Sequence, residues 1–211
     1  MKSSCFSCTA LVLAIAASCA IRNGIQLHGM VEKGDVAGLR AELLKGADPN
    51  VTDPDGNTLL HRALFAKQYV IVDLLLEREA GVNIPNKAFE TPLFIAVHAG
   101  DVKTVRRLLL AKADPNLVKA SGTAPLHVAA FANQDEIVLL LLGHGADIEQ
   151  RDYAGRTPLF MAVEEHSYEA IKVLVDAGAN VDARNKGAVS PRLRAREMGD
   201  RTALRLLAAE R

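Results

Sequence analysis

The sequence of 211 residues has no tryptophan, few other aromatic residues and no net charge. Phe and Tyr together make up 4 % of the chain, and 25 basic residues balance 25 acidic ones. Proteins that bind nucleic acids or membrane surfaces usually carry a basic excess, so the neutral total argues against both classes. With 49 % hydrophobic residues, the chain is too apolar for disorder and long enough to bury a substantial core. An interior rich in Ala and Leu suits thin layers of packed helices.

Cysteine is absent from most of the chain. Its three residues, Cys5, Cys8 and Cys19, all precede residue 20. The remainder therefore has no intradomain disulfide, no zinc cluster built on cysteine and no cysteine nucleophile. A body without cysteine fits an oxidising compartment, although chance gives the same result.

The first 20 residues have the composition of a signal peptide. Lys2 supplies a positive charge, no charged residue follows until after Ile21, and residues 11–17 form a short apolar run. This run is shorter than the ~20 residues that span a bilayer. We therefore expect residues 1–20 to be a cleaved signal peptide and the protein to be secreted or periplasmic. The alternative, a first core helix, is disfavoured because the segment matches no position of the repeat described below.

Cys19 follows three small residues, Ala16, Ala17 and Ser18. This arrangement resembles the bacterial lipobox, in which the cysteine becomes a lipidated N-terminus, but Ala16 stands where that motif usually has Leu. Two outcomes stay open: lipidation of Cys19, which anchors the protein in a bacterial envelope, or ordinary cleavage after Cys19 or Ala20. A lipid on Cys19 is the only membrane contact we expect.

The rest of the chain repeats with a constant period of 33 residues. One position holds Thr58, Thr91, Ala124, Thr157 and Ser190, and the next residue is proline in four of these five copies. No insertion interrupts the period. The same spacing relates Ala63, Ala96, Ala129, Ala162 and Ala195, and also Leu75, Leu108, Leu141, Leu174 and Leu207.

This period and its motifs resemble the ankyrin repeat. Residues 124–127 (APLH) and 157–160 (TPLF) match the T-P-L-H motif of that family, and residues 46–50 (GADPN) and 145–149 (GADIE) match its G-A-D-x-N motif. The resemblance covers residues 24–211. It implies an all-α solenoid of about six helix-turn-helix units with projecting β-turn or hairpin loops. The approximate units are 24–55, 56–88, 89–121, 122–154, 155–187 and 188–211.

The residue types at these positions have a physical reason. Thr or Ser caps the first helix of each pair, and proline fits the first helical turn because its missing N–H is not needed there. Gly145 and Gly178 end second helices, and Asp152–Gly155 is typical of a turn. The first and last units depart from the pattern, as terminal caps with polar outer faces do.

The neutral total charge is an average. Residues 184–211 contain eight basic and three acidic residues, whereas residues 19–183 contain 16 basic and 22 acidic ones. The basic end is interpreted as a soluble cap or as a docking point for an acidic partner or an anionic surface.

No pattern in the chain predicts catalysis, a cofactor or a metal site. The resemblance implies that His61 and His127, and with them His28, hydrogen-bond locally and brace the turn. The other three histidines lack the three or four converging ligands that a metal needs. The sequence also lacks G-x-S-x-G and a glycine-rich phosphate loop. We expect a protein that is not an enzyme.

The resemblance implies that a partner lies across the turns and the first helices, which line a concave groove in this family. The positions that carry over to this chain are Phe65, His98, Phe131 and Glu164 on helices and Lys87, Glu90, Tyr153 and Arg156 on turns. Phe65 and Phe131 occupy the same position two repeats apart, and the alternative is that both pack onto neighbouring repeats. Phe89 stands where three other turns have glycine.

These features predict a non-catalytic protein-interaction module, a monomeric scaffold or adaptor that is secreted or held in the envelope. Its partner is another protein and not a nucleic acid, because DNA binding through the arginine-rich end conflicts with a signal peptide. The alternative is a protective or chaperone-like envelope component that supports a stress-defence enzyme.

Overall fold

The computed structural model describes residues 24–208, which form six pairs of helices, with short connections inside each pair and longer loops between pairs. The all-α fold predicted from the sequence is therefore confirmed. Contacts divide the chain into two compact units, residues 1–81 (unit 1) and 82–211 (unit 2), and each is described by itself. The predicted signal peptide and Cys19 lie outside the described residues. No helix among the described residues is long and apolar enough to span a bilayer.

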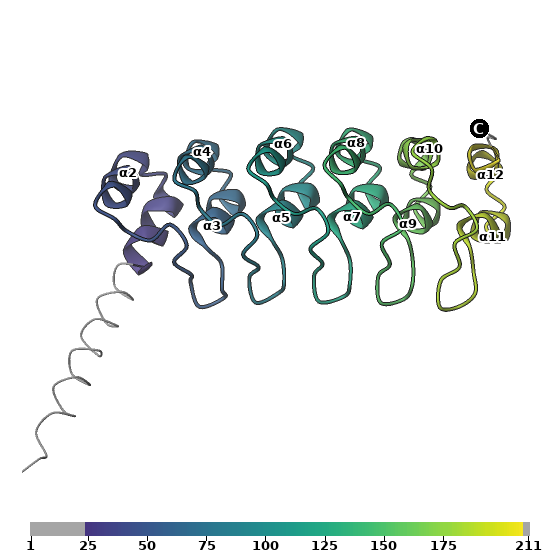
Figure 1. Ribbon diagram of the computed structural model, residues 1–211, viewed down its shortest axis with the longest axis horizontal. Helices are drawn as coiled ribbons and strands as arrows, with labels where there is room; N and C mark the ends of the chain where they lie inside the picture. The colour runs from purple at the N-terminus through teal and green to yellow at the C-terminus, as the bar shows by residue number, and fades with distance from the viewer. Residues whose placement is uncertain (1–23, 209–211) are drawn as a thin grey trace, which may run out of the picture. The chain divides into compact units, whose positions relative to one another are not determined.

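Unit 1 contains two helix pairs. A helix over residues 24–33 precedes α2 (Val36–Leu44), and α3 (Leu59–Phe65) precedes α4 (Tyr69–Glu77) (Figure 1). Helix α4 packs against both α2 and α3. The contact buries Leu39, Leu59 and Leu75 completely. The loop before α3 is closed by an isolated antiparallel bridge between Thr52 and Thr58.

Unit 2 contains four helix pairs arranged in two rows. The first helices α5, α7, α9 and α11 pack side by side in chain order, and so do the second helices α6, α8, α10 and α12. The long loops that join one helix pair to the next project from the side of the first helices, away from the second helices (Figure 1). The bounds are α5 Pro92–His98, α6 Val102–Leu110, α7 Pro125–Phe131, α8 Asp135–Gly143, α9 Pro158–Glu164, α10 Tyr168–Asp176, α11 Pro191–Glu197 and α12 Arg201–Leu207.

The first helices begin where the repeated Thr or Ser predicts. The hydroxyl groups of Thr91, Thr157 and Ser190 accept the backbone N–H three residues later, at 3.2–3.3 Å, and proline occupies the first turn that follows. Ala124 has no hydroxyl to offer. There, the Nδ1 atom of His127 accepts the N–H of Ala124 at 3.2 Å. A side chain inside the helix thus bonds to the backbone of the capping residue.

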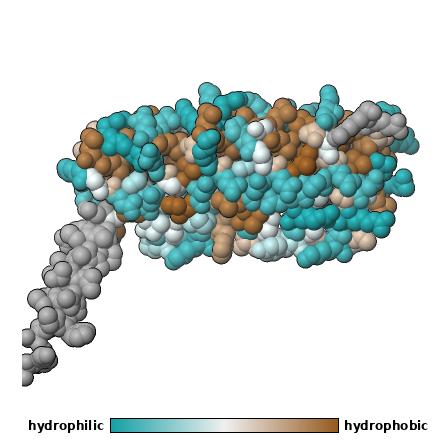
Figure 2. All heavy atoms as spheres, in the orientation of Figure 1, coloured by the Kyte–Doolittle hydropathy of each residue, from teal (hydrophilic) through white to brown (hydrophobic). Residues whose placement is uncertain are grey.

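The repeated small and large apolar residues explain how the rows pack. Ala129, Ala162 and Ala195 in the first row have no exposed surface, which lets neighbouring helices approach closely. Leu141 and Leu174 in the second row are also fully buried. Larger apolar residues also reach the surface, and Figure 2 shows hydrophobic patches among hydrophilic residues on the face in view.

The polar residue that ends a repeat bridges to the next one at four positions, Asn50, Asn83, Asn116 and Glu149. The Oδ1 atom of Asn116 accepts the N–H of Asp147 at 2.8 Å, and its Nδ2 atom donates to the Gly145 carbonyl at 2.9 Å. Glu149 occupies the same position one repeat later, and its Oε1 atom accepts the N–H of Asn180 at 2.6 Å. These bonds satisfy backbone groups after the second helices and set the register between repeats.

Candidate functional site

Three turns of unit 2 are built on Asp or Asn side chains, and a fourth begins at Lys119. In three of them, one Oδ1 atom accepts the N–H groups two and four residues later, at 2.8–3.0 Å. Such Asx bonds fix the backbone of the turn. The loop tips are therefore preformed surfaces. The three residues are Asn86, Asp152 and Asn185.

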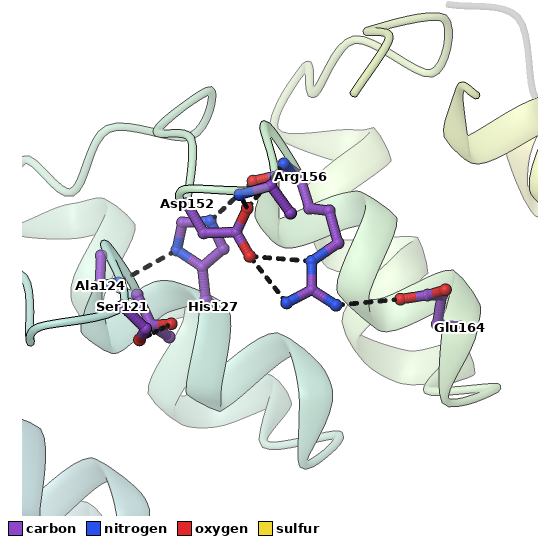
Figure 3. Close-up of polar contacts among 8 residues, drawn as sticks. Ser121, Ala124, His127, Asp152, Arg156 and Glu164 are labelled. Atoms are coloured by element: carbon purple, nitrogen blue, oxygen red, sulfur yellow. Dashed lines mark hydrogen bonds and ion pairs between the residues drawn. The ribbon is translucent and has the colours of Figure 1, made fainter. Parts of the chain in front are cut away.

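Asp152 has a second role, because it also holds an arginine of its own turn (Figure 3). Its Oδ2 atom accepts from both Nε and Nη2 of Arg156 at 2.8 Å, a two-pronged charged contact. Burial by itself raises the pKa of Asp152. The hydrogen bonds from Arg156 and Ala154, together with the charge of Arg156, bring this pKa below its ordinary value. Asp152 is therefore an ionised, buried anchor of the turn.

The same arginine extends the network to two helices. Nη1 of Arg156 lies 3.5 Å from Oε2 of Glu164 at the end of α9, and Nη2 of Arg194 on α11 lies 3.1 Å from Oε1 of Glu164. The structure thus brings together two residues predicted to bind a partner, Arg156 and Glu164, in an ion pair with each other. Their charges are largely balanced within the protein. Figure 3 shows Glu164 on the far side of Arg156 from Asp152.

His127 joins this turn to the helix before it (Figure 3). Nδ1 accepts the N–H of Ala124, so the ring proton lies on Nε2, which donates to the Arg156 carbonyl at 3.0 Å. His61 is also buried, and its Nδ1 atom accepts the N–H of Thr58 at 3.2 Å. The prediction of a locally hydrogen-bonded histidine is confirmed at both positions.

The same prediction is wrong for His28. Both ring nitrogens of His28 are buried without a hydrogen-bond partner. The reason is local: residue 25, which corresponds to the capping residues Thr58 and Ala124, already lies within the helix over residues 24–33. No extended capping residue therefore offers its N–H to the ring.

We expect the free energy of unfolding to fall below about pH 6.5 through His127. Burial lowers the pKa of His127 from its ordinary 6.5, only partly opposed by the Arg156 carbonyl. As the pH falls below 6.5, the unfolded chain binds a proton at this histidine more readily than the folded protein does. The contribution of His127 to the free energy of unfolding is therefore complete above pH 6.5 and is lost as the pH falls. The loss is at most about 1.4 kcal/mol per pH unit. Urea unfolding at pH 7.5, 6.5 and 5.5 measures it.

A matched control for this experiment is present in the chain itself. The double variant Ala124→Thr, His127→Phe gives residues 124–127 the sequence of residues 157–160. It should unfold with a smaller dependence on pH than the parent protein. An unchanged dependence would assign the effect to other groups.

Three exposed aromatic residues, Phe89, Phe131 and Tyr153, lie on the turns and first helices of unit 2, and we call them the aromatic face. Their exposed fractions are 57 %, 45 % and 66 %. Tyr153 covers the preceding turn, because a Cβ atom added to Gly122 would lie 2.6 Å from its ring. Phe131 ends α7, and its carbonyl accepts the hydroxyl of Ser167 at 2.9 Å. The aromatic side chains are thus held on rigid backbone while their rings remain accessible.

Phe89 is held in a strained conformation. Its φ angle is 60°, in the left-handed region where the equivalent turns place Gly122 and Gly155. A non-glycine residue in this region costs about 1–2 kcal/mol. Burial of the ring offsets little of this cost because Phe89 is mostly exposed. Ala188, at the same position of a later turn, has a φ angle of 62°, so the left-handed conformation is a property of the turn and not of Phe89 alone.

The other predicted binding residues do not form one cluster. His98 ends α5 and is exposed, Lys87 is exposed beside Phe89, and Glu90 is half-buried at the end of the same turn. Phe65 is exposed at the end of α3 in unit 1. Among residues 24–208, no group of three or more metal-ligating side chains converges.

Sequence reasoning missed a histidine–aspartate pair. Nδ1 of His166 lies 2.7 Å from Oδ2 of Asp200 across 34 positions of sequence. The pair has no catalytic arrangement around it: Oδ1 of Asp200 caps α12 through the N–H of Ala203, and the neighbouring Ser167 donates its hydroxyl to a backbone carbonyl. The turn that begins at Asp152, in contrast, is predicted from the sequence of residues 152–155.

The sequence is similar to known ankyrin-repeat sequences. Residues 27–119 and 93–185 match the family model described as ankyrin repeats. An ankyrin-repeat protein of Fowlpox virus is 41 % identical over 78 residues, which are 36 % of this chain and 18 % of that protein. One from Rickettsia felis is 38 % identical over 66 residues, or 29 % of each chain. The matched regions thus span less than a third of these relatives.

A solved structure covers more of the chain. The crystal structure of an ankyrin repeat domain from Acinetobacter baumannii superposes with a TM-score of 0.82 and 26 % sequence identity. The match covers 86 % of this chain and 95 % of the other.

Proposed function

Because the chain belongs to the ankyrin-repeat family, whose repeats generally mediate protein interactions, we propose that it binds another protein as a monomer and without catalysis. The observation that carries the proposal is the aromatic face of unit 2. Its three rings are exposed on turns and helix ends whose backbones are already fixed by Asx bonds, caps and helical packing.

The physical argument concerns the cost of binding. A rigid surface loses little conformational entropy when a partner docks. Aromatic residues account for much of the binding energy at protein interfaces. Arg156 follows Tyr153 in the same turn, and its ion pairs connect that turn to Glu164 on α9 and, through Glu164, to Arg194 on α11. Charged groups at an interface set orientation more than affinity.

The proposal is tested by photo-crosslinking in cells of the source organism. A photoreactive phenylalanine analogue replaces Phe131 or Tyr153, and the matched control replaces Leu139, which is 57 % exposed on α8 in the other row of helices. We expect the same discrete adduct from positions 131 and 153 and none from position 139. Equal adducts from all three positions, or none, would remove the support for this surface.

Phe131→Ala should weaken binding to the crosslinked protein by about 1–3 kcal/mol, which is roughly a 5- to 150-fold rise in Kd. The free energy of unfolding should change little because the ring is about half exposed. Calorimetric titration and thermal unfolding of the same samples measure both. A large fall in Tm would show that Phe131 belongs to the core instead.

A second substitution separates binding from folding more sharply. Phe89→Gly removes the ring and also relieves the left-handed strain, so it should stabilise the fold by about 0.5–1 kcal/mol while weakening binding. If the variant is more stable but binds more weakly, the loss of binding cannot be a consequence of unfolding.

We also propose that the protein is exported through its N-terminal segment and works in the envelope or outside the cell. The support is the sequence of residues 1–20, with one early lysine and an uncharged apolar run before Cys19. Mass spectrometry of the protein from the source organism tests it. A diacylglyceryl group on Cys19 identifies a lipoprotein, a start at Ala20 or Ile21 identifies a soluble secreted form, and an intact Met1 contradicts export.

A further inference from the structure

The four turns of unit 2 carry an excess of positive charge. Residues 85–90, 118–123, 151–156 and 184–189 contain six basic and two acidic residues, whereas the rest of residues 82–208 contains 10 basic and 13 acidic ones. The long loops project from the same side of the first helices, so this excess lies on one side of unit 2 (Figure 1). The six basic residues are Lys87, Lys119, Arg151, Arg156, Arg184 and Lys186.

Two of these six cations are already engaged. Arg156 is held by Asp152, and Nζ of Lys119 lies over the ring of Phe94, 5.2 Å from its centroid. The other four, Lys87, Arg151, Arg184 and Lys186, are exposed, and none of them forms an ion pair with a carboxylate among residues 24–208. Their charges are therefore open to a partner.

Three of the four exposed cations lie on the same two adjacent turns as Tyr153. The N–H of Lys186 donates to the Ala154 carbonyl at 3.0 Å, which joins one turn to the other. Nη1 of Arg151 donates to the carbonyls of Gly155 at 2.9 Å and Arg184 at 2.6 Å, so it also bridges the two turns. We call Arg151, Tyr153, Arg184 and Lys186 the basic tip.

The basic tip combines a fixed backbone with free side-chain donors. The N–H of Tyr153 donates to the Ser121 carbonyl at 3.2 Å, which ties the tip to the preceding turn as well. The ring of Tyr153 is exposed, and the side chains of Arg184 and Lys186 make no hydrogen bond to residues 24–208. Arginine and lysine donors complement carboxylates, and an exposed tyrosine ring packs against apolar groups.

The surroundings of the basic tip favour a short acidic stretch over a long polyanion. Glu164 and Glu165 end α9, and Glu164 is 3.5 Å from Arg156 of the same turn as Tyr153. A nucleic acid carries charge along its whole length, so it would meet these carboxylates where it extended from the turns to the first helices. A polypeptide can present carboxylates at the tip and uncharged residues beyond it.

We infer that the basic tip docks a segment of the partner in which Asp or Glu residues flank an apolar residue. The inference rests on the proposed function and specifies the chemistry of the partner. The carboxylates pair with Arg184 and Lys186, and the apolar side chain packs on the ring of Tyr153. Because these ion pairs are exposed, added salt weakens them.

The experiment titrates the full-length chain with capped peptides at low ionic strength and follows the ring resonances of Tyr153 by NMR. The probe is a leucine flanked on each side by two glutamates, and its counterparts carry glutamine or lysine instead of glutamate. We expect a saturable, salt-sensitive shift with the glutamate peptide alone among the three. Equal shifts with the glutamine peptide, or no shift with any peptide, would overturn the inference.

Two other anions test the class of partner. Single-stranded oligothymidylate and phosphatidylglycerol vesicles are titrated in the same way. We expect both to bind more weakly than the glutamate peptide. Tighter binding of either one would assign the basic tip to a nucleic acid or a membrane surface and contradict an acidic polypeptide.

A matched pair of double variants locates the effect. Arg184→Gln with Lys186→Gln should raise the Kd of the glutamate peptide roughly 2- to 30-fold, the range expected for two exposed ion pairs. Lys103→Gln with Lys172→Gln removes the same charge from exposed positions on α6 and α10, in the other row of helices, and should leave the Kd unchanged. Equal effects would reduce the interaction to general attraction and contradict a docking site.

The crosslink at position 153 separates this inference from the proposed function. We expect the adduct to map to a segment of the partner that contains Asp or Glu beside an apolar residue. An adduct on a segment without acidic residues overturns the inference and leaves protein binding in place. If no adduct forms, the proposed function loses its support, and the peptide titration still decides the chemistry of the basic tip.

Discussion

Leu141→Ala should lower the free energy of unfolding by about 3 kcal/mol, within the 2–5 kcal/mol range typical of buried leucines. Leu141 lies in α8 and has no exposed surface, and α8 packs between α6 and α10. Truncation removes apolar contacts and leaves a cavity that the neighbouring helices cannot fill without losing their register. Urea denaturation followed by circular dichroism measures the loss.

The same helix provides the control. Leu139 lies two residues earlier in α8 and is 57 % exposed, so Leu139→Ala should change the free energy of unfolding by less than about 0.5 kcal/mol. The two substitutions delete the same atoms from the same helix. Similar losses would contradict the assigned packing of α8 and the meaning of the leucines that recur every 33 residues.

The second large effect is expected from Asp152→Ala, with a loss of about 2–4 kcal/mol in the free energy of unfolding. The substitution removes the acceptor for the N–H groups of Ala154 and Arg156. It also leaves the partly buried guanidinium of Arg156 with only the longer contact to Glu164. Chemical denaturation of the purified variant measures this loss.

Asp152→Asn divides this effect into its two parts. Asn86 and Asn185 hold equivalent turns through the same Oδ1 bonds, so asparagine at position 152 should preserve the turn and lose only the charge opposite Arg156. We expect a loss of about 1 kcal/mol. If the Ala and Asn variants are equally unstable, the charge accounts for the whole effect and the Asx bonds contribute nothing measurable.

Much of the fold follows from the sequence because the repeat is encoded by short-range rules. A capping Thr or Ser, proline in the first turn and a left-handed glycine after the second helix act within a few residues of one another. The structure places helix starts at Thr91, Thr157 and Ser190 as these rules predict. A constant period then brings equivalent apolar residues into contact in every copy. Exposed positions follow from the same period, and Phe131 and Tyr153 are exposed as expected.

The tertiary structure decided what depends on contacts between repeats and on the paths of long side chains. Glu164 lies between Arg156 and Arg194 because two helices and a turn meet there, and no spacing rule for a single helix relates these three residues. The partners of His127 lie in its own helix cap and in the next turn, whereas His28 has neither, although both occupy the same repeat position. The sequence by itself thus determined the all-helical repeat and its exposed positions, since these need only local propensity and periodicity. The different surroundings of His28 and the internal pairing of Arg156 and Glu164 required three-dimensional placement, because hydrogen bonds and ion pairs are decided over a few ångströms between residues distant in sequence.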